Sequence, residues 1–219
     1  MPSVRVRYQT LEFGLLDIHV RTLKDKQQFS DPLGEAEALG ISSAQWSLFG
    51  VIWDSSQILA AEMAVFEIKD KRILEIGCGM ALSSLLLNAR HADITATDCH
   101  PEAASFLIEN VRLNKGATIP FLRVDWKDLN DGLGLFDAII GADILYEKQH
   151  SELLSQFIHR HAKPSCEVIL VDPGRGHHSH FSKKMLQLGY THHQFQPQPL
   201  ETLTSLFKGK VLKYAKIAA

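Results

Sequence analysis

The sequence predicts an α/β fold, in which helices cover both faces of a largely parallel sheet. The first reason is the stretch 72–86, where an apolar run from Ile73 to Ile76 is followed by a glycine turn and then by leucines at spacings of three and four. Such a run is typical of a strand buried on both faces, and such leucines of a helix. The second reason is that strand and helix patterns alternate along most of the remaining chain.

Composition sets limits on the kind of protein. Of the 219 residues, 45% are hydrophobic and 22% charged, which is typical of a globular protein with room for a sizeable core. The net charge of −2 gives no general attraction to nucleic acid or anionic membranes. No apolar run approaches the roughly 20 residues of a membrane span, and the start lacks a signal-peptide core. We therefore expect a cytoplasmic monomer with neither nucleic acid nor membrane as partner.

The N-terminal region differs from the rest of the chain. Residues 4–20 alternate apolar and polar side chains around Gly14, which predicts a β-hairpin outside the main unit. Residues 30–40, with Pro32 and Gly34, are expected to form a loop. A helical pattern then covers 49–68. We therefore assign residues 1–45 to an extension and 46–219 to the main domain.

The glycine turn after the first central strand is a candidate ligand site. Gly77 and Gly79 allow positive φ and leave the backbone open to a ligand, and the N-terminus of the next helix favours a nucleotide-type group. A dinucleotide fingerprint needs a small residue at position 82, so Leu82 disfavours a nicotinamide dehydrogenase. A tight turn with nothing bound is the alternative if no other strand end points to the same crevice.

Asp98 provides that second strand end. It closes the alternating run from Ile94 to Thr97 and stands 21 residues after Gly77 (98 − 77). An acid at about 20 residues is the expected partner of ribose hydroxyls. With Glu75, two residues before the first glycine, these positions indicate an adenosine-bearing cofactor.

The later elements follow in the same order. A helix from Pro101 to about Lys115 leads to a strand at 121–124 and then to Asp125 and Trp126. The next strand, 136–142, leads to Asp143 and Tyr146. The remaining pattern predicts a helix at 153–161, a strand at 167–171, a helix at 181–188, and strands at 190–195 and 211–217.

These motifs resemble a known family. Glu75, Gly77, Gly79 and Ala81 form the acidic-x-Gly-x-Gly-x-small pattern of motif I in Rossmann-like methyltransferases that use S-adenosylmethionine (SAM). The segments 50–53, 143–146 and 172–175 resemble family 16, the lysine-directed seven-strand methyltransferases. The resemblance covers about residues 50–175. It implies a Rossmann-like sheet of seven strands, the last antiparallel, with SAM across the strand ends.

The resemblance also implies residue roles. The tryptophan helps enclose SAM, the acid at 125 faces the adenine amino group beside an aromatic residue, and the Asp-x-x-Tyr lies beside the transferred methyl. The catalytic residues would be Asp143 and Tyr146, with Asp143 positioning the substrate rather than acting as a strong base. The implied cofactor-binding residues are Trp53, Glu75, Gly77, Cys78, Gly79, Asp98, Cys99, Asp125, Trp126 and Ala142.

The expected function is a SAM-dependent N-methyltransferase acting on a protein lysine, without a metal. A small-molecule methyltransferase and a SAM-binding protein without catalysis remain alternatives, because a fold does not determine its acceptor. The histidines at 177, 178 and 180 lack the carboxylate or cysteine pattern of a metal site and are expected in a solvated loop.

Four smaller questions stay open at this stage. Ala81 suits the turn if its φ is negative. Arg175 either contacts an acidic group of the substrate or braces Asp172. Asn110 and Asn114 fit an Asn-x-x-x-Asn spacing of family 16, but surface or capping roles explain them equally well. The cysteines are expected to be free thiols, and oxidation of Cys78 and Cys99 would block the cofactor site.

Overall fold

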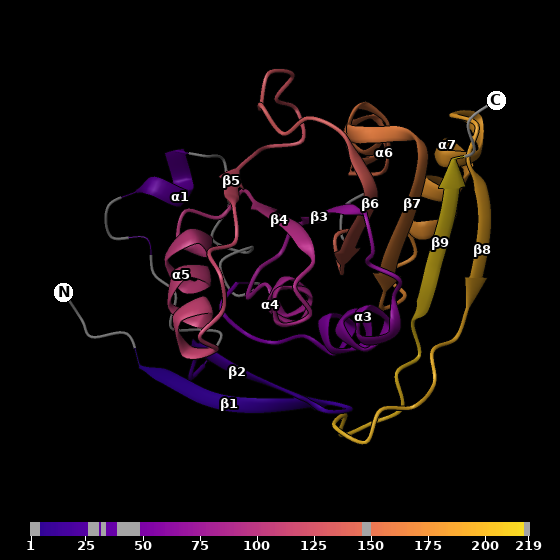
Figure 1. The fold of residues 1–219 in the computed structure, drawn as a ribbon. Coiled ribbons are helices and arrows are strands. Elements are labelled where there is room, and N and C mark those ends of the chain that lie inside the picture. The colour runs from indigo at the N-terminus through magenta and orange to yellow at the C-terminus, as the bar shows by residue number, and fades with distance from the viewer. Residues whose placement is uncertain (1–4, 26–30, 32–33, 39–48, 146–149, 217–219) are drawn as a thin grey trace.

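The computed structural model describes residues 5–25, 31, 34–38, 49–145 and 150–216. Its centre is a seven-stranded sheet in the order β5-β4-β3-β6-β7-β9-β8 (Figure 1). The pairs from β5 to β7 are parallel, and β9, the last strand in the chain, is antiparallel to both its neighbours. The strands are β3 (Arg72–Ile76), β4 (Asp93–Asp98), β5 (Phe121–Arg123), β6 (Phe136–Ala142), β7 (Ala162–Asp172), β8 (Thr191–Phe195) and β9 (Lys210–Lys216).

Two hydrophobic clusters pack on the two faces of this sheet. Because successive side chains of a strand point to opposite faces, neighbouring residues contribute to different clusters. In β3, Ile73 belongs to one cluster and Leu74 to the other, and in β6 Ile139 faces away from both Ala138 and Ile140. The continuous apolar runs of the sequence are thus explained by burial on both faces.

The helices divide between the two faces. On the first lie α3 (Asp54–Val65), α4 (Leu82–Ala89) and α5 (Ala103–Leu113), and on the second α6 (His150–His161) and α7 (His178–Gln187) (Figure 1). A short helix, α1 (Glu35–Ala38), precedes them, at a place where the sequence predicted only a loop. None of the described helices is long and apolar enough to cross a membrane.

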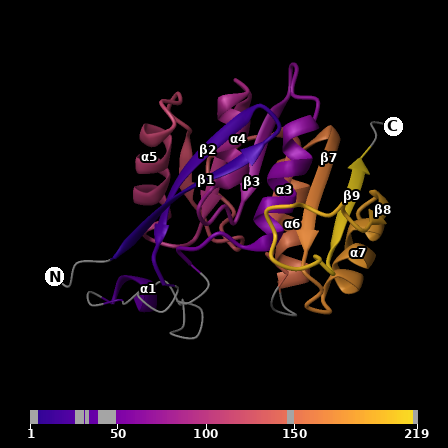
Figure 2. The same ribbon diagram turned by 90° about the horizontal axis from the view of Figure 1, so that it is seen from below.

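The predicted N-terminal hairpin is present as β1 (Val6–Phe13) and β2 (Leu16–Leu23), a separate two-stranded sheet. It lies across the layer of α4 and α5 rather than apart from it (Figure 2). Phe13, Ile18 and Val20 join the same cluster as the first face of the large sheet. The hairpin therefore completes the core, and the expected domain boundary at residue 45 falls outside the described residues.

Asn110 and Asn114 hold the hairpin against α5. The side-chain amide of Asn110 accepts from the backbone N–H of Arg21 at 2.7 Å and donates to its carbonyl at 3.3 Å. Asn114 does the same with His19, at 2.8 and 2.6 Å. Two side-chain amides, four residues apart, thus bond the backbone N–H and C=O groups at the free edge of β2, where a further strand would otherwise do so. Asn114 is also the C-cap residue of α5, where its amide donates to the carbonyl of Asn110 at 2.7 Å, so the capping alternative holds for Asn114, whereas the bonds to the hairpin were not predicted from the sequence.

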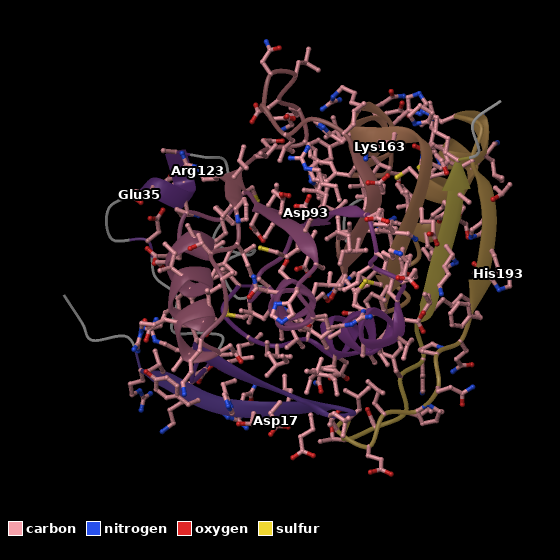
Figure 3. The ribbon with its side chains drawn as sticks, viewed as in Figure 1. Asp17, Glu35, Asp93, Arg123, Lys163 and His193 are labelled. Carbon is pink, nitrogen blue, oxygen red and sulfur yellow. The ribbon has the colours of Figure 1, made fainter. Side chains whose placement is uncertain are left out.

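Asp17 and His193 mark the periphery, on the hairpin and on the edge strand β8 (Figure 3). Helices cover the faces of the sheet between these two residues. The loops at the carboxyl ends of β3 to β7 are therefore the expected place for a ligand site.

Candidate active site

The glycine turn after β3 is tied to the end of β4. Gly77 and Gly79 both have positive φ, +60° and +52°, as the sequence predicted from their type. The backbone N–H of Cys78 donates to the carbonyl of Thr97 at 2.9 Å, and that of Gly79 donates to the carboxylate of Asp98 at 2.7 Å. The two strand ends therefore form one unit.

Glu75 is buried beneath this turn, with 3% of its surface exposed. One carboxylate oxygen accepts from the backbone N–H of Ser84 at 2.9 Å and also from the Ser84 hydroxyl. Burial, with a further contribution from the charge of Asp98, raises the pKa of Glu75 to about 7. Glu75 thus caps the start of α4, where N–H groups lack partners within the helix. Ser84 was not predicted from the sequence, because its partner lies nine residues away on the other side of the glycine turn.

Asp98 lies at the end of β4 with both carboxylate oxygens occupied by backbone donors. One accepts from Gly79 and the other from the N–H of His100 at 2.8 Å. Burial raises the pKa of Asp98, although these hydrogen bonds oppose the shift. Since a carboxylate oxygen has two lone pairs, further acceptor sites remain for hydroxyl groups.

Asp125 and Trp126 follow β5, the next strand of the sheet. Asp125 is exposed, accepts from the N–H of Lys127 at 3.0 Å and forms an ion pair with its ammonium at 3.6 Å. Asp125 therefore caps the turn that follows β5, and its expected contact with adenine remains a prediction. Trp126 is half-buried against the second hydrophobic cluster.

The two cysteines predicted at this site lie in different surroundings. Cys78 is buried and Cys99 is an exposed residue, and both are free thiols. Desolvation and the carboxylates of Asp98 and Asp125 raise the pKa of Cys99 to about 12, and burial also raises the pKa of Cys78. Little thiolate is available at either, so both are poor nucleophiles and slow to oxidise.

Asp143 begins the loop after β6. Its backbone is left-handed, with φ of +54°, and its N–H donates to the carbonyl of Val171 in β7 at 2.9 Å. Ala142, half-buried, closes the strand before it. Ile144, the following residue, packs on the glycine turn, because a Cβ on Gly77 would lie 2.7 Å from its side chain. The candidate catalytic loop and the glycine turn are thus in contact, while Tyr146 lies outside the described residues.

Arg175 pairs with Asp143, a possibility not weighed from the sequence. Its Nε and Nη2 donate to the two Asp143 oxygens at 2.6 and 2.7 Å. Asp172 instead accepts from the N–H of Gly174 at 3.1 Å and lies 3.3 Å from Nδ1 of His178. The turn after β7 thus aims Arg175 across to the neighbouring strand end.

The structure also describes Ala81, the histidines near α7 and Trp53, for which the sequence led to specific expectations. Ala81 has φ of +57°, so the condition of a negative φ is not met and the alanine sits in a conformation that favours glycine. His178 and His180 lie in the first turn of α7 rather than in a loop. No cluster of three possible metal ligands occurs in the described ranges. Trp53 directly precedes α3, where its carbonyl accepts from Ser56 and Gln57.

The residues around the turn fit a cationic nucleoside such as SAM. Glu75 and Asp98 are carboxylates held in a desolvated place, and an ammonium or sulfonium nearby would stabilise their charged forms. A Cβ placed on Gly79 would meet nothing within 4 Å, so the backbone there is open to a ligand. The glycines, Asp98 and Glu75 would hold the cofactor, which supplies the activated methyl group.

The two glycines allow a matched test of this turn. Gly77→Ala and Gly79→Ala both impose a side chain on a positive φ, but only at position 77 does the new Cβ meet Ile144 at 2.7 Å. We expect Gly79→Ala to cost about 1 kcal/mol of unfolding free energy from backbone strain and Gly77→Ala about 1–3 kcal/mol more from overpacking. Urea denaturation without cofactor measures both. Equal losses would show that Ile144 does not press on the turn.

The strand order, the antiparallel last strand and the acids at neighbouring strand ends define a Rossmann-like methyltransferase of the SAM-dependent class. The family model described as lysine methyltransferase matches residues 38–187. The chain belongs to this lysine methyltransferase family, which confirms the resemblance inferred from its motifs.

Curated relatives agree with this family. The chain is 30% identical over 158 residues to the protein N-lysine methyltransferase METTL21A of Xenopus tropicalis, covering 67% of this chain and 71% of that protein. It is 30% identical over 140 residues to METTL21A of Danio rerio, covering 59% and 63%. It is 27% identical to EEF1A lysine methyltransferase 3 of X. tropicalis, covering 62% and 63%. The match thus spans less than two thirds of the length of two of these relatives.

Solved structures show the same fold at low identity. The 16S rRNA N2 G1207 methyltransferase of T. Thermophilus, in complex with AdoMet and guanosine, superimposes with a TM-score of 0.67 at 13% identity, covering 98% of this chain and 51% of that one. The magnesium protoporphyrin IX methyltransferase of Synechocystis PCC 6803, with bound SAH, gives a TM-score of 0.59 at 16% identity, covering 74% and 82%. These similarities confirm the predicted fold class.

Proposed function

We propose that this protein transfers methyl groups from SAM to lysine side chains of a protein substrate. The observation that carries the proposal is the contact between the glycine turn and the loop of Asp143, through Ile144 and Gly77. In our proposal, the acidic side chain of Asp143, at the tip of β6, lies beside the bound methyl donor, and this contact supports that arrangement. The names of the relatives, which denote protein-lysine methyltransferases, support the same acceptor.

In this proposal the chain mainly orients two reactants. SAM carries a methyl group on a positive sulfur, which is already activated for transfer. Glu75 and Asp98 hold the donor at the glycine turn, and Asp143 accepts hydrogen bonds from the acceptor amine, so that its lone pair is aimed at the methyl. Because binding has already removed the translational and rotational freedom of the two reactants, this entropy loss no longer adds to the barrier of the reaction. We assign Tyr146 to shaping the channel through which the acceptor lysine reaches the methyl group, and this role comes from the family pattern.

We propose a monomer that acts in the cytoplasm on protein rather than nucleic acid. The free state of all three cysteines suits a reducing compartment, and the net charge of −2 provides no general attraction to phosphates. Size-exclusion chromatography with light scattering tests the oligomeric state.

Labelling with tritiated SAM tests the function. The protein is incubated with heat-treated cell extract, and labelled proteins are digested and examined for methyl-lysine by mass spectrometry. Asp143→Asn, which keeps a residue tolerant of positive φ, should lower the labelling rate about a hundredfold through lost orientation, with SAM affinity unchanged in calorimetry. Asp93→Asn, at the exposed start of β4, is the matched control and should label normally.

Three outcomes would contradict the proposal in different ways. Label found only on metabolites would favour a small-molecule methyltransferase. SAM binding without label on any acceptor would favour a binding protein without catalysis. No SAM binding at all would remove the cofactor assignment.

A further inference from the structure

The ion pair between Arg175 and Asp143 closes off part of the proposed acceptor site. The guanidinium donates to both carboxylate oxygens in a fork, at 2.6 and 2.7 Å. The Asp143 side chain is 10% exposed, whereas that of Arg175 is 37% exposed. The pair therefore lies at the boundary between the strand tips and solvent, where an incoming lysine would arrive.

The pair matters because methyl transfer needs a neutral amine. A carboxylate beside a lysine favours the charged ammonium, and a second cation beside it disfavours that form. Asp143 without Arg175 would thus hold the acceptor lysine in its unreactive state. A carboxylate has about four lone-pair sites, and the fork uses two of them, so the remaining sites can still accept the N–H groups of an amine.

We propose that Arg175 is a positioning residue that orients Asp143 and offsets its charge, so that the bound acceptor lysine loses its proton before methyl transfer. This inference rests on the proposed function. One proton leaves the lysine ammonium for solvent. The freed lone pair then forms the N–C bond while the S–C bond breaks with its electrons remaining on sulfur, which leaves a methylated, positively charged amine.

Other charges face this pair and are part of the same electrostatic environment. Asp172, at the tip of β7, lies close enough for its charge to interact with both Asp143 and Arg175, and burial raises its pKa. His178, at the start of α7, lies 3.3 Å from Asp172 on the side of that helix. Both groups are retained in every variant compared below, so a difference between variants at the same pH reports on Arg175.

The test is the pH dependence of kcat, with tritiated SAM and the strongest labelled protein of the heat-treated extract as acceptor. Arg175→Gln should shift the rising limb of the profile upward by about one pH unit, with about a tenfold loss below it and recovery above it. Arg175→Lys keeps the charge but not the fork, and should shift less. SAM affinity should not change in either variant.

Arg112→Gln is the matched control. Arg112 makes a similar fork with Glu109 on the exposed face of α5, at 2.9 and 2.7 Å, away from the strand tips. Its removal should leave the profile unchanged.

Two results would overturn the inference while leaving the proposed function intact: Arg175→Gln lowering kcat equally at every pH, or Arg175→Lys shifting the profile as far as Arg175→Gln does. If the glutamine variant fails to fold, Arg175→Met, which also removes the charge, replaces it in both comparisons. Absence of label with the unmodified protein would instead refute the proposed function.

Discussion

Replacing Glu75 by glutamine should make the protein less sensitive to alkaline pH. Burial raises the pKa of Glu75 from its ordinary value of 4.5 to about 7. A carboxylic acid that binds its proton more tightly in the folded chain stabilises the fold at low pH, and this contribution is lost as pH rises from the unfolded to the folded pKa. Between pH 4 and pH 8 the loss amounts to about 3 kcal/mol, at about 1.4 kcal/mol per pKa unit.

The measurement is urea denaturation of the cofactor-free protein at several pH values. Glutamine keeps an oxygen that can accept from Ser84, so it removes the titration but not the helix cap. The unfolding free energy of Glu75→Gln minus that of the parent should therefore grow by about 3 kcal/mol from pH 4 to pH 8. Titrations elsewhere cancel in this difference. A constant difference would mean that Glu75 does not titrate in this range.

Asn110→Ala should destabilise the protein by loosening the hairpin from α5. Asn110 is fully buried and provides both partners for the backbone of Arg21. Its loss leaves a half-buried N–H and a half-buried C=O of Arg21 without their bonds, at about 1–3 kcal/mol each. We expect a loss of about 3 kcal/mol in unfolding free energy, with faster hydrogen exchange at the Arg21 amide.

Asn114→Ala is the control for this prediction. The half-buried Asn114 makes the same two bonds to His19, but these bonds are exposed to solvent, where water replaces them, so a loss of about 1 kcal/mol is expected. Similar losses for both variants would show that the hairpin docks through its apolar face alone and that the amides contribute little.

The middle of the sheet was predictable because β3, β6 and the second half of β7 are buried on both faces and have mostly apolar sequences. The fourth central strand was expected at 136–142, and β6 has these bounds. The strand expected at 167–171 begins earlier in the structure, at Ala162. Its first half was not predicted because it contains polar side chains and Pro164 instead of an apolar run. The helix α1 has only four residues, too few to show a periodic pattern beside Pro32 and Gly34.

The sequence could predict which acidic residues stand at the strand ends of the candidate site. It could not predict which side chains contact one another there. Asp98 and Asp143 were identified because they stand at strand ends, and Glu75 because it lies two residues before Gly77. Which side chain meets which depends on distances across the sheet. Arg175 is three residues from Asp172 in sequence, yet it pairs with Asp143 on the next strand. The partners of Asn114 likewise lie 95 residues away.

That separation also constrains how the chain can acquire its structure on the ribosome. An isolated two-stranded hairpin is at best marginally stable in water. Arg21, in the second strand of the hairpin, is synthesised 89 residues before Asn110, the asparagine that holds it. Until that helix has been synthesised, Ile18 and Val20 lack part of the apolar surface that buries them in the finished protein. A nascent chain that stalls before residue 110 would therefore expose apolar side chains of its N-terminal hairpin, to which chaperones could bind.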